Sequence, residues 1–165
     1  MTKRKFANPN LGKLDLNQVT QQIVQFIKTK PDYSYRLVIG SDSREKKLNG
    51  KKELNLIGAV VIHRQGKGGR YFYLKQKKKF PHTIREKIYT ETLFSLKIAG
   101  RLLPVLNQRL NGKKPYELEI HIDVGRYGKT REMIKEVVGI VTGSGYQAKT
   151  KPESFGASKV ADKHT

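Results

Sequence analysis

The sequence contains no cysteine and no tryptophan among its 165 residues. Without cysteine, the chain cannot form disulfides, a cysteine-ligated zinc site or a thiol nucleophile. It also has no run of about 18 consecutive apolar residues, so we predict no membrane-spanning helix. The segment from Met1 to Asn10 has basic residues but no apolar core typical of a secretory signal. We therefore expect a cytoplasmic protein that is not bound to a membrane.

Acidic residues are scarce. The chain has 34 Lys and Arg against 14 Asp and Glu, a formal net charge of +20. The excess is also local, with nine basic residues and one acidic residue over 64–87, and five against one over 44–52. A field of this strength attracts polyanions before any detailed contact forms. The basic runs lack a helical apolar stripe, so an anionic membrane is a weaker candidate partner than nucleic acid.

Aromatic residues are interleaved with the basic run, and nucleic-acid surfaces often combine basic grooves with stacking platforms. We therefore expect a nucleic-acid partner, whether RNA, DNA or a hybrid, with Tyr71 or Tyr73 stacking on a base. The residues predicted to bind it are Arg44, Lys67, Arg70, Lys77, Lys78, Lys79 and Lys129. No feature of the sequence determines the oligomeric state.

The order of the predicted elements indicates an α/β fold. We expect an irregular basic arm over residues 1–13 and a single domain over 14–165. Apolar periodicity predicts helices over 15–28, 83–107 and 130–142, and a last helix after Ser154, with Pro104 kinking or shortening the second. Predicted strands cover 35–41, 54–63, 70–74, 116–122 and 146–149, and a polar stretch rich in Lys, Asn and Gly covers 44–52. This order implies a mixed five-stranded sheet with helices on both faces and an extra N-terminal helix.

Two of the five aspartates, Asp42 and Asp123, follow apolar segments that we expect to be strands. Ligands bind at the carboxyl ends of the strands in α/β sheets. If these two strands are parallel neighbours, the carboxylates lie close together and repel one another. A divalent cation between them removes that conflict, and hard oxygen ligands suit Mg²⁺ or Mn²⁺.

Two further carboxylates complete the candidate group. Glu91 lies on the apolar stripe of its predicted helix and therefore points toward the sheet. Glutamate is rarely buried without a partner, which is either a lysine or arginine or a functional ligand. Asp162 shares a face of the last predicted helix with Phe155 and Ser158; alone, such a residue is usually solvated.

The four carboxylates together, in this order and context, resemble those of the ribonuclease H-like nucleases, and more narrowly of the YkuK-type ribonuclease H-like family. The matching segments are residues 39–43, 63–69, the helix around Glu91 and Thr92, 121–125, and 151–163. Ser41 stands where the family usually has Thr, and Arg44 stands where Gln is usual. The resemblance implies a ribonuclease H-like fold and, from the superfamily, nuclease activity on a substrate that it does not specify.

The mechanism that this resemblance implies is two-metal hydrolysis of a phosphodiester by Mg²⁺ or Mn²⁺. Asp42 would bridge both ions, Glu91 and Asp123 would complete one coordination shell, and Asp162 the other. One ion would activate the attacking water and the other would stabilise the leaving oxygen. His164, His121 and Ser43 are accessory candidates.

The sequence also bears on three interpretations other than a nuclease. The segment from Gly125 to Thr130 ends in Gly-Lys-Thr, but a P-loop needs four residues between its glycines and this turn has two, so we expect no nucleotide cofactor. The strongest alternative to a nuclease is a nucleic-acid-binding protein that keeps the fold without cleavage. A structural protein bound to RNA in a larger assembly is a third possibility.

Overall fold

The protein is described here from a computed structural model, which places residues 6–81, 83–125, 128, 130–151, 153–154, 159–160 and 163–164. The strands are β1 (Phe6–Asn8), β2 (Gly12–Leu14), β3 (Tyr35–Leu48), β4 (Lys51–Arg64), β5 (Gly69–Lys79), β6 (Glu117–His121) and β7 (Gln147–Lys149). The helices are α1 (Leu16–Thr29), α2 (Ile84–Arg109) and α3 (Ile134–Gly143), with a 3₁₀ turn at Arg131–Met133 before α3. Within these described residues, no helix is long and apolar enough to cross a membrane.

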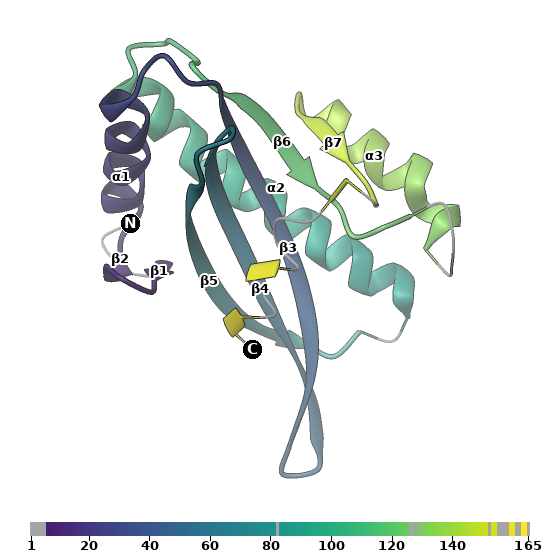
Figure 1. Cartoon of the computed structure of the whole chain (residues 1–165). Helices are drawn as coiled ribbons and strands as arrows, with labels where there is room; N and C mark the ends of the chain where they lie inside the picture. The colour runs from purple at the N-terminus through teal and green to yellow at the C-terminus, as the bar shows by residue number, and fades with distance from the viewer. Residues whose placement is uncertain are drawn as a thin grey trace.

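The strands form one mixed sheet in the order β2-β1-β5-β4-β3-β6-β7 (Figure 1). Strands β3, β4 and β5 form an antiparallel meander, whereas β6 runs parallel to β3 and β7 parallel to β6. The predicted mixed α/β class is confirmed. The predicted strand number was two too low, because β1 and β2 extend the sheet beside β5.

The two faces of the sheet are covered differently. Helices α1, α2 and α3 all pack on one face, here called the helix face, where alternate residues such as Leu37, Ile39 and Phe72 join the main core. On the other face, here called the second face, Val160 packs on Ala59 of β4. The helical residues described near the C-terminus lie in front of β4 and β5 in Figure 1, so helical segments flank both faces.

The two ends of α1 are fixed by side chains. Asp15 caps its N-terminus through a reciprocal hydrogen-bond pair with Gln18. At the other end, the Tyr35 hydroxyl donates to the Lys30 carbonyl at 2.6 Å, and Arg64 Nε donates to that hydroxyl at 2.9 Å. These bonds satisfy groups that a helix end would otherwise leave unpaired, and they attach α1 to the sheet.

Three local features differ from the expectations. Residues 44–52, a polar stretch outside the predicted strands, belong to β3 and β4, which continue to a two-residue turn at Asn49 and Gly50, whose φ angles are 53° and 78°. Positive φ angles at both central residues are characteristic of the tight hairpin turn that an Asn-Gly pair favours. Residues 6–14 of the supposed irregular arm form the hairpin β1–β2. Helix α2 does not end early at Pro104 but continues to Arg109, because neighbouring residues such as Leu106 pack into the core.

Candidate metal centre

The candidate site lies beside β3, beyond the point where its parallel neighbour β6 ends. The last residue pair between these strands is Gly40 with His121. Asp42 therefore lies in the middle of the 14-residue strand β3 and not at a strand end, which corrects the sequence-based placement. Asp123 follows the end of β6 as predicted. The long partner strand β4 keeps β3 extended past this point.

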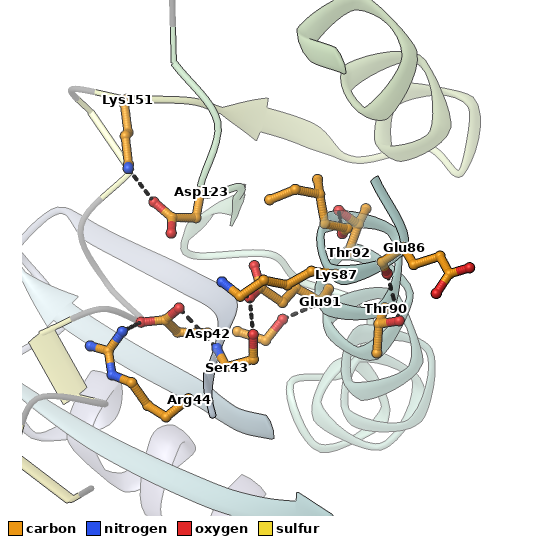
Figure 2. Close-up of polar contacts among 12 residues, drawn as sticks. Asp42, Ser43, Arg44, Glu86, Lys87, Thr90, Glu91, Thr92, Asp123 and Lys151 are labelled. Carbon is orange, nitrogen blue, oxygen red and sulfur yellow. Dashed lines mark hydrogen bonds and ion pairs between the residues drawn. The ribbon is translucent and has the colours of Figure 1, made fainter. Parts of the chain in front are cut away.

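Three of the four predicted carboxylates converge here. One oxygen from each of Asp42, Glu91 and Asp123 lies within 4.8 Å of the other two. Asp42 comes from the sheet, Asp123 from the segment after β6, and Glu91 from helix α2, as Figure 2 shows. Asp42 and Glu91 are buried and Asp123 is half-buried. The grouping thus joins segments that are far apart in the sequence.

Three serines hold Glu91 and its helix against β3. The Ser43 hydroxyl donates to Glu91 Oε2, and the Ser41 hydroxyl donates to the Glu91 backbone carbonyl. Ser41 also shares a hydrogen bond of 2.7 Å with Ser95, one turn further along α2. The Ser43 backbone N–H donates to Asp42 Oδ1 at 2.8 Å. Ser43, predicted as an accessory residue, therefore contacts two of the three carboxylates.

Each carboxylate also has a basic neighbour. Lys87 Nζ lies 3.2 Å from Glu91 Oε2, Arg44 Nη1 lies 3.0 Å from Asp42 Oδ2, and Lys151 Nζ lies 2.9 Å from Asp123 Oδ1. The dashed lines in Figure 2 mark these pairs. Neither Lys87 nor Lys151 was predicted from the sequence as a neighbour of these carboxylates. The spacing of four residues between Lys87 and Glu91 on one helix was a signal for the first. For Lys151, no local pattern pointed to Asp123.

Burial dominates the electrostatics of the cluster. It raises the pKa of Glu91 to about 7, against the opposing effects of Lys87 and the Ser43 hydroxyl. Burial also raises the pKa of Asp42, and the hydrogen bond from Ser43 and the charge of Arg44 partly offset this rise. The two buried carboxylates thus hold negative charge at a cost that a bound cation would reduce.

The donor set fits a divalent cation. Within the described part of the chain, the buried Glu91 Oε1 has no hydrogen-bond partner. An unpaired buried carboxylate oxygen is costly, because its interaction with water is lost and not replaced. Carboxylate oxygens converging from three segments are ligands that Mg²⁺ and Mn²⁺ prefer. Glu91, Asp42 and Asp123 are the residues that would hold such an ion.

The two predicted accessory histidines lie in other settings. His121 is buried in β6, where its Nε2 lies 3.0 Å from Glu119 Oε1, and Arg36 pairs with the other Glu119 oxygen at 3.2 Å. Burial lowers the pKa of His121. His164 Nε2 lies 2.8 Å from the Tyr71 hydroxyl, and its ring stacks on Tyr73. Neither histidine belongs to the group of three carboxylates.

The predicted nucleic-acid-binding residues are divided between the two ends of the sheet. Lys77, Lys78 and Lys79 are exposed at the end of β5. Lys67 lies at the opposite end, in the turn between β4 and β5. Nearby, Arg70 donates to Gln22 of α1 at 2.7 Å and lies over the Phe26 ring, so it helps to hold α1 on the sheet. Asp162 and Lys129 lie outside the described residues.

Comparisons with known proteins agree with this architecture. The family model described as ribonuclease H-like matches residues 18–165. The chain belongs to the ribonuclease H-like family. It is also 31% identical to the Uncharacterized protein YkuK of Bacillus subtilis (strain 168), over 97% of this chain and 96% of the relative. The expected YkuK-type membership is thereby confirmed. No solved structure matches the chain significantly.

Proposed function

We propose that this protein is a metal-dependent nuclease that hydrolyses phosphodiester bonds with Mg²⁺ or Mn²⁺. The observation that carries the proposal is the convergence of Asp42, Glu91 and Asp123, together with a buried oxygen of Glu91 that has no partner among the residues the structure describes. Family membership supports the nuclease class, and the net charge of +20 supports a nucleic-acid substrate. Asp162 remains our proposed fourth carboxylate, for a second ion.

The chain's own residues would prepare the site in three ways. Ser43 orients Glu91 and Asp42 together, since it hydrogen-bonds both carboxylates. Ser41 and Ser95 fix the approach of α2 to β3. Arg44, half-exposed beside Asp42, would pair with a substrate phosphate. A bound divalent ion would supply Lewis-acid polarisation of the phosphodiester and of the attacking water.

The decisive experiment replaces Asp42 with asparagine. We expect Asp42→Asn to abolish cleavage of single-stranded, duplex and hybrid substrates in Mg²⁺ or Mn²⁺, while binding of the same substrates in EDTA survives. Asp15→Asn is the matched control, because it makes the same chemical change at the N-cap of α1, where asparagine caps as well as aspartate. Mn²⁺ should raise the melting temperature of the wild type and of Asp15→Asn, but not that of Asp42→Asn.

A second candidate function is a nucleic-acid-binding protein without catalytic activity. The observation in its favour is that each clustered carboxylate already has a basic neighbour. Ion pairs of this kind can be purely structural. The binding protein is favoured if the wild type binds nucleic acid but cleaves no substrate with either metal, and if Mn²⁺ leaves its melting temperature unchanged.

A further inference from the structure

The β3–β4 hairpin projects from the body of the protein, as Figure 1 shows. The two strands remain paired from Tyr35 with Arg64 as far as Leu48 with Lys51. Strand β5 accompanies them to the pair of Lys79 with Glu53. We call residues 44–55 together with 75–79 the arm, which is a different segment from the N-terminal arm predicted over residues 1–13. Its three paired strands make it a defined surface and not a loose basic loop.

The register assigns every arm side chain to one face. Successive side chains in a strand point to opposite faces. Ser43 and Leu56 are opposite one another on the helix face, where Ser43 contacts Glu91 and Leu56 joins the core. Asp42 and Ile57, one step away, therefore belong to the second face, and their cross-strand neighbour on β5 is Lys75.

Positive charge gathers on the second face of the arm. Its basic residues are Arg44, Lys46, Lys51, Lys75, Lys77 and Lys79. The acidic residue of the arm on this face is Glu53, which lies 4.0 Å from Lys77. The helix face of the arm carries Lys47, Lys52 and Lys78 with Glu45. The second face of the arm therefore carries more basic residues than the helix face, and Asp42 of the carboxylate cluster lies on the same second face.

Among the described residues, two tyrosines of β5 lie next to the arm on the second face of the sheet, and both are already engaged. Tyr73 stacks on the His164 ring at 3.9 Å, and the Tyr71 hydroxyl hydrogen-bonds the same histidine. The expectation that either tyrosine stacks on a base is therefore not supported. Proteins that bind single strands combine a basic groove with available stacking platforms. A basic surface whose described neighbouring tyrosines are occupied in this way suits the phosphate backbone of a duplex, whose bases are already stacked.

We propose that the second face of the arm binds the phosphate backbone of a nucleic-acid duplex, independently of base sequence, and directs it toward the carboxylate cluster. This inference rests on the proposed function for its direction, but its test needs no cleavage. From Arg44 to Leu48 the strand spans about 13 Å. A duplex carries one charge per ~1.7 Å of its axis, so several phosphates can lie along this surface.

The two faces of the arm provide a matched pair of variants. One variant changes Lys46, Lys51 and Lys79 of the second face to glutamine. The control changes Lys47, Lys52 and Lys78 of the helix face in the same way, so both proteins lose three positive charges. Lys78 was predicted from the sequence to bind nucleic acid, but the register places it opposite Leu54 on the helix face, so it is not part of the surface proposed here. Binding of a fluorescently labelled duplex of about 20 base pairs is measured by anisotropy in EDTA at several salt concentrations. Because all six lysines are exposed, both variants should fold, and circular dichroism checks this.

We expect the second-face variant to bind the duplex at least tenfold more weakly than the wild type at moderate salt, with its salt slope reduced by about three. The control should weaken binding less than threefold. The wild type should bind the duplex more tightly than a single strand of the same length. Equal losses in both variants would mean that only the overall charge matters, and preferential binding of the single strand would also overturn the proposal. Neither result depends on whether Asp42→Asn abolishes cleavage, so the two proposals fail separately.

Discussion

Replacing Glu91 with glutamine tests the carboxylate cluster through protein stability, without an assay of activity. Burial raises the pKa of the Glu91 carboxyl from 4.5 to about 7. In the unfolded chain the carboxyl is hydrated and returns toward its ordinary pKa. The folded state therefore binds this proton more tightly than the unfolded state. As a result, the stabilisation that protonated Glu91 contributes is complete below pH 4.5 and is lost as the pH rises through about 7.

The magnitude follows from the difference between the two pKa values. A rise from 4.5 to about 7 corresponds to about 3 kcal/mol at about 1.4 kcal/mol per pKa unit. Glutamine has nearly the same shape, can accept the Ser43 hydrogen bond, and does not ionise. We expect Glu91→Gln to match the wild type near pH 4.5 and to be up to about 3 kcal/mol more stable at pH 8. For a chain of this size, that difference raises the melting temperature by about 6–12 °C.

The assay is thermal unfolding between pH 4.5 and 8 in EDTA, repeated with Mn²⁺. Asp42 and His121 also titrate with shifted pKa values, but they do so in both proteins and largely cancel from the comparison. Glu86→Gln is the control, because Glu86 is an exposed residue on the same helix. Mn²⁺ should stabilise the wild type much more than Glu91→Gln. A stability difference that does not grow with pH would refute the reasoning about Glu91.

Two further predictions concern the packing that holds the site. Gly58→Ala should lower the free energy of unfolding by about 1–3 kcal/mol, because the added methyl group would lie 3.0 Å from Phe94 and 3.1 Å from Leu74 in a closed core. Denaturant unfolding measures this loss, and unchanged stability would contradict the close approach of α2 to β4. Tyr35→Phe should lower the free energy of unfolding by about 1–3 kcal/mol, because it leaves Arg64 Nε without its hydroxyl acceptor. Tyr33→Phe, at an exposed neighbouring residue, is the control, and an equal loss of stability in both variants would show that the Tyr35 bond contributes little.

Much of the carboxylate cluster could be predicted because short sequence patterns indicate the orientation of its side chains. Glu91 lies on the apolar stripe of a long helix, so its orientation toward the sheet follows from helical periodicity. Asp123 follows an apolar segment with strand alternation and lies just beyond β6. Asp42 was identified for a partly wrong reason, because the strand continues beyond it. The site lies at Asp42 because the neighbouring strand β6 ends before this point. The sequence of β3 does not show where β6 ends.

The arm and the occupied tyrosines show what local patterns could not reveal. The lysine-rich residues 44–52 have low intrinsic strand propensity, yet pairing with a long partner strand holds them extended. The Asn49-Gly50 pair was the available signal for a tight hairpin turn. No such signal existed for His164, which reaches Tyr71 across 93 residues of sequence. Contacts of this kind depend on where the C-terminal segment packs, which is decided by the whole fold.

The basic neighbours of the cluster differ from the carboxylates in exposure, and this difference decides how an ion could enter. The Lys87, Arg44 and Lys151 side chains are 27%, 40% and 55% exposed, whereas those of Glu91 and Asp42 are 4% exposed. Long basic side chains can keep their stems on the protein and move their charged ends into water. The buried carboxylates cannot move in this way. We therefore expect the three basic side chains to move away from the carboxylates when a divalent ion binds. They would stay at the exposed edge of the site, where a phosphate would approach. The same side chains would then stabilise the acidic residues in the ion-free protein and hold the substrate in the loaded one.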